Sequence, residues 1–155
     1  MRREFNISYF VASIMLLNFV GCKNVSAQED FSEKQVVTML KDFYTSYISE
    51  YSKIPEDKKK LDSIKAKYWT PKLSNYVGKL FREQRIDNDP FLKSQMIDIL
   101  ILKTISFSKD LKQNNIYYGF YIWPGEKNSI VIKLLIAKEK EAYKIDHVFI
   151  EGIDE

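Results

Sequence analysis

The sequence predicts an α+β fold in which N-terminal helices pack on a curved, four-stranded antiparallel sheet. In the first half of residues 31–155, apolar side chains recur at helical spacing, and in the second half they alternate with a period of two. The links between the expected strands are short, which is typical of antiparallel hairpins. Because helices precede strands rather than alternate with them, the class is α+β. The 155 residues suffice for one such domain with an appendage.

Composition excludes several function classes. A 14% aromatic content supplies the large side chains of a real core. A single cysteine excludes an intrachain disulfide framework and a multi-cysteine zinc site, and a single histidine excludes a His-rich metal site. The net charge of +3 is too small to indicate a nucleic-acid partner, and the basic run Lys58–Lys60 has acidic neighbours. Glycine-rich phosphate loops and a G-x-S-x-G elbow are absent from the sequence, so we expect no cofactor.

The first residues are expected to direct export. Arg2 and Arg3 precede an apolar stretch that ends near Val20, so residues 1–21 are predicted to be a signal peptide. The stretch is shorter than the roughly 20 apolar residues that a membrane-spanning helix needs. Residues 22–30 are polar and nonperiodic, and they are expected to form a tether to the domain of residues 31–155.

The end of this stretch, Phe19-Val20-Gly21-Cys22, resembles the lipobox of bacterial lipoproteins, although the family usually has Leu where Phe19 stands. The resemblance implies cleavage before Cys22, attachment of lipid to its thiol, and a membrane-anchored lipoprotein that faces the periplasm or the cell exterior. The alternative is ordinary cleavage after Ala27, which would give a soluble periplasmic protein.

Three helices are expected, followed by four strands. Ser32 and Gln35 form a capping box that predicts a helix from there to about Lys53. Residues 56–68 suggest a second helix, and Thr70-Pro71 begins a third. The strands are expected at residues 97–107, 116–123, 129–138 and 143–150. In the last strand, alternation places Lys144 and Asp146 outward and therefore His147 inward.

Two segments carry a family resemblance: residues 89–95 (DPFLKSQ), and residues 137–139 (AKE) followed by residues 143–146 (YKID). They are similar to motifs of a domain-of-unknown-function family of exported bacterial proteins, over about residues 33–151. Ser94 stands where that family commonly has Ala, and Tyr143 where it has Trp. Helices packed on such a sheet resemble the nuclear-transport-factor-2-like, or cystatin-like, cone. The resemblance implies this fold and an exported location but no activity.

Candidate functional residues are few, and each has a structural alternative. Aromatic side chains on one helix face and one strand face predict either core packing or an aromatic-lined pocket or docking face. His147 is a weak candidate acid or base, and the alternative is a buried histidine with one hydrogen bond. Asp87, Asp89 and Asp98 lack calcium-loop spacing and fit turn chemistry, so no metal site is expected. The aromatic candidates are Tyr44, Tyr47, Tyr51, Tyr117, Tyr121 and Trp123.

These observations favour a non-enzymatic binding domain that is held at a membrane by its lipid and takes a small molecule or a protein partner. One alternative is a small pocket enzyme of the same fold that uses His147. Another is an immunity-type or inhibitor protein. No nucleic-acid partner is expected.

Overall fold

The computed structural model describes residues 25–154, with side chains from Glu33 onward. Backbone contacts divide the chain into two units, Met1–Ser32 and Glu33–Glu155, and the fold described below is that of the second unit. The expected signal peptide and Cys22 lie outside the described residues. Among the helices of residues 25–154, none combines the length and the apolarity that crossing a membrane requires.

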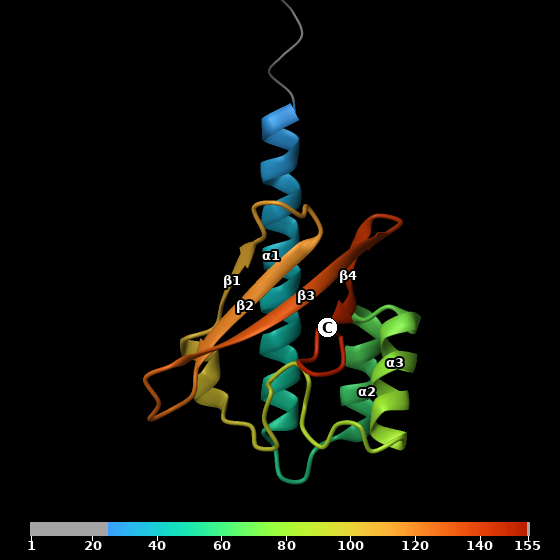
Figure 1. Ribbon diagram of the computed structural model, residues 1–155, viewed down its shortest axis with the longest axis vertical. Helices are drawn as coiled ribbons and strands as arrows, with labels where there is room; N and C mark the ends of the chain where they lie inside the picture. Colours follow the sequence, from blue (N-terminus) through green and yellow to red (C-terminus); the bar gives the residue numbers. More distant parts are fainter. Residues whose placement is uncertain (1–24, 155) are drawn as a thin grey trace, which may run out of the picture. The chain divides into compact units, whose positions relative to one another are not determined.

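Three helices lead the described chain: α1 (Val25–Tyr51), α2 (Lys58–Tyr68) and α3 (Pro71–Arg82) (Figure 1). Helix α1 begins earlier than expected, so Ser32 lies inside it and the capping-box prediction is wrong. Residues 25–30, which were expected to belong to a tether, are helical. The physical reason is that neither Gly nor Pro interrupts residues 25–51, and a helix propagates through such a stretch.

The two shorter helices begin at side-chain caps. Asp57 accepts a hydrogen bond from the backbone N–H of Lys60, at 3.1 Å, and so caps α2. Thr70 Oγ1 accepts from the N–H of Leu73, at 3.2 Å, with Pro71 in the first turn of α3. The predicted start of the third helix at Thr70-Pro71 is thus confirmed.

The sheet is an antiparallel meander with strand order β1-β2-β3-β4. This arrangement confirms the α+β class. One strand differs from its prediction, because residues 97–107 form a short 3₁₀ helix, η1, and only then a strand. Asp98 Oδ1 accepts from the N–H of Leu100 at 2.8 Å, and this cap turns the apolar run into a helix. The bounds are η1 (Ile99–Lys103), β1 (Ser106–Lys109), β2 (Ile116–Ile122), β3 (Ser129–Glu139) and β4 (Ala142–Val148).

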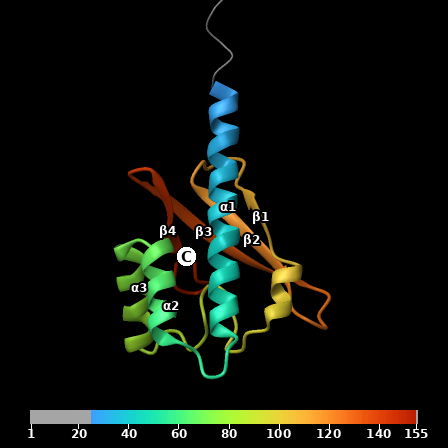
Figure 2. The same ribbon diagram turned by 180° about the vertical axis from the view of Figure 1, so that it is seen from behind.

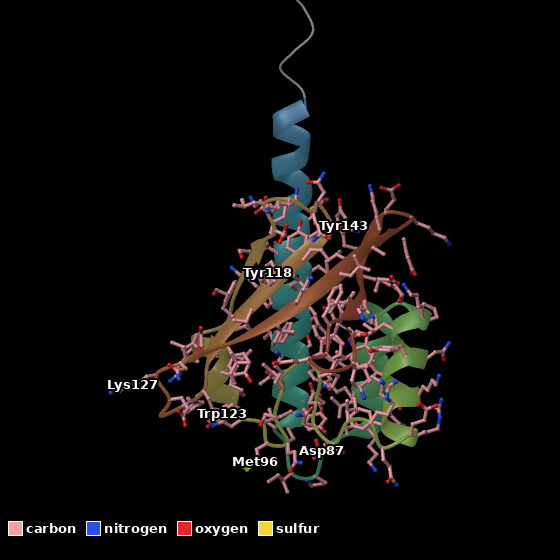
Figure 3. All side chains as sticks on the ribbon, in the orientation of Figure 1. Asp87, Met96, Tyr118, Trp123, Lys127 and Tyr143 are labelled. Atoms are coloured by element: carbon pink, nitrogen blue, oxygen red, sulfur yellow. The ribbon has the colours of Figure 1, made fainter. Side chains whose placement is uncertain are left out.

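Helix α1 covers one face of the sheet, which lies in front of it in Figure 1 and behind it in Figure 2. The core forms between them, and buried residues alternate with more exposed ones from Tyr117 to Ile122 in β2 and from Val131 to Ala137 in β3. The opposite sheet face carries Tyr118, labelled in Figure 3, together with the exposed Val131. Core side chains from α1 and the two strands include Leu40, Phe43, Tyr44, Tyr47, Tyr117, Tyr121, Ile132 and Leu134.

Helices α2 and α3 contact each other and β4. The junction between them is fastened to this strand, because the backbone N–H of Thr70 donates to the carbonyl oxygen of Ile145 at 2.9 Å. Asp146 accepts from Thr70 Oγ1 at 2.9 Å and pairs with Lys72 at 2.7 Å. These bonds hold the helical pair beside the last strand.

A β-bulge in β4 reverses the expected side of His147. Leu135 pairs with His147 but Ile136 pairs with Ile145, so Asp146 is the extra residue. Ile145 and Val148 are therefore both buried on the core face. His147 lies opposite Leu135, on the other face, so the prediction that it points inward beside Ile145 is wrong.

Candidate functional site

Three buried tyrosine hydroxyls converge on the segment Asp89–Leu92, which follows α3. From α1, Tyr44 donates to the carbonyl oxygen of Phe91 at 3.2 Å, and Tyr47 donates to Asp89 Oδ2. From β2, Tyr121 donates to the carbonyl oxygen of Leu92. The segment that carries the family resemblance is thus tied both to the helix and to the sheet.

Asp89 organises this segment from inside. Its Oδ1 accepts from the backbone N–H groups of Phe91, at 2.8 Å, and Leu92, at 3.0 Å, so the side chain performs the turn role that aspartates often have. Burial raises the pKa of Asp89, although Tyr47, the two N–H groups and Lys65 act in the opposite direction. Together with Tyr47, the two N–H groups satisfy both carboxylate oxygens.

The predicted aromatic face separates into core and surface. Tyr44, Tyr47, Tyr117 and Tyr121 are buried within the core. The two others are only partly buried, and each lines a different hollow. Tyr51 lies at a hollow between the helices. Trp123, labelled in Figure 3, lies with residues of η1 and the β2–β3 turn around a shallow hollow of about 290 Å³.

A hollow of about 370 Å³ lies between α1, α2, α3 and the Asp89-Pro90 turn. We call it the helix pocket. Its volume is at the lower end of the range for small-molecule sites, about 300–1,000 Å³. The lining residues are Tyr47, Tyr51, Asp62, Lys65, Ala66, Trp69, Ser74, Val77, Gly78, Phe81, Asp89 and Pro90.

Trp69 is the most informative residue of the helix pocket. It follows the last turn of α2, is only 4% exposed, and stacks on Phe91 with ring centroids 4.7 Å apart. Its Nε1 is buried and has no hydrogen-bond partner anywhere in the described part of the chain. Buried donors are nearly always paired, because an unpaired one retains its full desolvation cost.

Two further donors of the helix pocket make no hydrogen bond within residues 33–154. Lys65 Nζ lies 5.6 Å from the Trp69 ring centroid and forms no ion pair with any described side chain. The Tyr51 hydroxyl donates no hydrogen bond within residues 33–154, and burial raises its pKa. The pocket has two carboxylates, Asp62 and Asp89. Asp62 is exposed and accepts no hydrogen bond within residues 33–154.

Gly78 lies in the middle of α3 and lines the helix pocket. Glycine in a helix interior is destabilising by roughly 0.5–1 kcal/mol relative to alanine. A Cβ here would meet only the far end of the Arg82 side chain, at 3.3 Å. Packing against the protein therefore does not require glycine at this position of the pocket lining.

His147 belongs to a separate cluster near the C-terminus. Its Nε2 lies 3.3 Å from Asp154 Oδ1, and the Tyr76 hydroxyl donates to the same oxygen at 2.7 Å. Asp154 Oδ2 also accepts from the backbone N–H of Ile150 at 2.7 Å. The His147 side chain is 19% exposed and lines neither of the two hollows, so the cluster fastens the C-terminal turn onto α3 and β4.

The remaining acidic candidates have structural partners. Asp87 accepts from Gln95 Nε2 at 3.0 Å, and Asp98 caps η1. Within residues 25–154, no group of three or more His, Cys, Asp or Glu side chains is arranged to hold a metal ion.

Sequence reasoning missed Lys65, Trp69 and Gly78. An isolated glycine inside a helical pattern was the available signal, since it costs stability and therefore often has a packing or functional reason. No comparable signal existed for Trp69, whose role depends on the contact between α2, α3 and the segment that follows α3.

The fold and this site place the protein among α+β domains in which a helix covers one face of a sheet and the helices border a small hollow. The chain is similar to the crystal structure of a protein of unknown function from Bacteroides thetaiotaomicron VPI-5482. The match has a TM-score of 0.69 and 25% sequence identity, and it covers 80% of this chain and 95% of that chain. No protein-family model matches the sequence, and no curated protein matches it either.

Proposed function

We propose that this protein is an exported, lipid-anchored, non-enzymatic domain that binds a small molecule in the helix pocket. The observation that carries the binding role is that Trp69, which lines the helix pocket, has a buried Nε1 with no hydrogen-bond partner within the described residues. An acceptor atom of a bound molecule would satisfy that donor. We also propose that the sheet and helices form a nuclear-transport-factor-2-like cone, which the order of three helices and a four-stranded meander supports.

The binding role is tested by following the Trp69 indole N–H resonance during a screen of small organic fragments. The sequence has two tryptophans, so Trp123→Phe leaves Trp69 as the single indole signal. We expect some fragments to shift this resonance saturably in the Trp123→Phe protein. Gly78→Leu, which adds a large side chain at the pocket lining, should abolish these shifts. Lys79→Leu, at an exposed position of α3 outside the pocket, should not.

Two results would contradict the binding role: an indole resonance that no fragment moves, or shifts that persist unchanged in Gly78→Leu.

Export and anchoring rest on the apolar N-terminal stretch and on Cys22. Metabolic labelling with a clickable fatty acid should mark the wild-type protein and not Cys22→Ser. Equal labelling of both proteins would contradict lipid attachment at Cys22. A mature N-terminus at Gln28 would contradict it too and would show cleavage by ordinary signal peptidase instead.

The enzyme alternative has less support. His147 has a carboxylate partner in Asp154, but this pair lies at neither hollow and Asp154 is engaged by Tyr76 and a backbone N–H. A substrate would need space beside the imidazole.

A further inference from the structure

From the donors that line the helix pocket, we infer that its ligand is a small organic anion, a carboxylate on a compact apolar body. This inference rests on the proposed binding function and adds the chemical class of the ligand. Five polar groups of the pocket make no side-chain hydrogen bond or ion pair within residues 33–154, and donors outnumber acceptors among them. They are Trp69 Nε1, the Lys65 ammonium, the hydroxyls of Tyr51 and Ser74, and the Asp62 carboxylate. A ligand that satisfies them must present acceptors, and a carboxylate presents two oxygens with about four lone-pair positions.

Charge supports the same conclusion. Lys65 Nζ lies 5.6 Å from the centroid of the Trp69 ring, and both residues line the helix pocket. A cation and an N–H on one wall can both donate to one carboxylate, and charge-assisted hydrogen bonds of this kind are roughly twice as strong as neutral ones. Asp89 also lines the pocket and interacts with the charge of Lys65, but both its oxygens accept bonds from other groups and no hydrogen bond joins it to Lys65.

The apolar part of the pocket lining determines the character and size of the rest of the ligand. The ring of Trp69 and the side chains of Val77, Phe81 and Pro90 present apolar surface, and Gly78 presents none that protrudes. Phe81 is 46% exposed, which is a large exposure for a phenylalanine at a hollow. A compact apolar or aromatic group would cover this surface, and a volume of about 370 Å³ limits its size.

Asp62 opposes the anion. It is exposed, lines the pocket, and precedes Lys65 by one helical turn without pairing with it among the described side chains. Its negative charge should weaken the binding of a carboxylate, so removal of this charge should strengthen it. This sign distinguishes an anionic ligand from a cationic one.

The experiment titrates the full chain carrying Trp123→Phe with phenylacetate and with its neutral analogue phenylacetamide, and follows the Trp69 indole resonance. We expect phenylacetate to bind at least about tenfold more tightly than the amide, as the loss of one charge-assisted bond implies. Lys65→Met should reduce the affinity for phenylacetate to that for the amide. Asp62→Asn should raise the affinity for phenylacetate severalfold. Lys59→Met, at an exposed position of the same helix outside the pocket, is the matched control and should change neither.

Each other outcome overturns the inference in a recognisable way. Equal affinities for acid and amide, or tighter binding of phenethylamine, would overturn the anionic class and leave the binding function intact. Phenylacetate binding that does not respond to Lys65→Met would overturn the assigned contact. If acid, amide, amine and all screened fragments leave the Trp69 resonance unmoved, both the ligand class and the proposed function fail.

Discussion

Tyr47 donates a hydrogen bond to the buried carboxylate of Asp89, and so joins the C-terminal part of α1 to the turn that follows α3. The two residues are 42 positions apart in the sequence, and both line the helix pocket. Burial together with Asp89 raises the pKa of Tyr47 well above its usual value, so the hydroxyl stays a donor at every physiological pH. Because Tyr47 is also a core residue, this bond links the wall of the pocket at Asp89 to the hydrophobic core.

Removing the donor of this bond should destabilise the fold. Tyr47→Phe leaves Asp89 Oδ2 buried without its partner, and we expect a loss of about 1–3 kcal/mol in the free energy of unfolding. Urea denaturation measures it, with an unchanged m-value showing that the fold is retained. Tyr118→Phe is the control, since that hydroxyl bonds Asp110 near the surface. An equal loss in both variants would mean that the buried Tyr47 bond contributes no more to the free energy of unfolding than the bond of Tyr118 near the surface.

Asp89 should make stability fall as the pH rises. Its pKa in the folded state is raised by burial, so the folded state binds its proton more tightly than the unfolded state does. The contribution of this carboxyl is full below its ordinary pKa of 3.8 and is lost as the pH rises through the folded-state value. Asp89→Asn, which imitates the protonated form, should therefore gain stability relative to wild type between pH 4 and pH 7. A constant difference across this range would contradict the raised pKa.

Glu50 should have the opposite pH dependence. It is 2% exposed, and ion pairs with Lys53 and Lys60 at 2.7 and 2.8 Å lower its pKa. Its stabilising effect is present above its ordinary pKa of 4.5 and is lost as the pH falls through the lower, folded-state value. The melting temperature of Glu50→Gln should be below that of wild type at pH 7 and should approach it at pH 3. A gap that widens toward acid pH would refute this sign.

Gly78→Ala should stabilise the domain while it narrows the helix pocket. The helix gains roughly 0.5–1 kcal/mol from the substitution, because alanine loses less backbone entropy than glycine. The added Cβ meets only the mobile end of Arg82. We expect a higher melting temperature together with weaker binding of fragments at Trp69. Destabilisation would show that the glycine is required by packing rather than by the pocket.

Substitution by aspartate should be much more destabilising on the buried face of α1 than on its exposed face. Leu40 is fully buried, and Leu40→Asp places an unpaired charge in the core at a cost of several kcal/mol, a large share of a total of about 5–15 kcal/mol. Lys41 is exposed, so Lys41→Asp should change stability by about half a kcal/mol or less. Circular dichroism during thermal unfolding gives both values, and similar shifts for the two variants would refute the face assignment.

The class of the fold was predictable because it depends on periodicity. The start of α3 at Thr70-Pro71 and the inward face of β3 follow from local rules, namely capping and alternation. The side of His147 was not predictable, since one extra residue in β4 shifts the alternation, and a bulge leaves no clear mark in a strand of this composition.

The site was less predictable than the fold. Aromatic side chains on α1 and β2 indicated a special environment, and the structure uses most of them as core that holds Asp89–Leu92. The helix pocket arises from contacts among α1, α2, α3 and the turn after α3. Such contacts are long-range, and no local pattern in α2 distinguishes Lys65 from its neighbouring lysines.

The central claim is that ligand binds in the helix pocket, and the most direct measurement is a set of intermolecular nuclear Overhauser effects between bound phenylacetate and the full chain carrying Trp123→Phe. The account predicts contacts from the phenyl protons to the Trp69 indole and the Val77 methyl groups. Contacts to Tyr118 and Val131 on the outer sheet face, or to His147 beside Asp154, with none to Trp69, would contradict it.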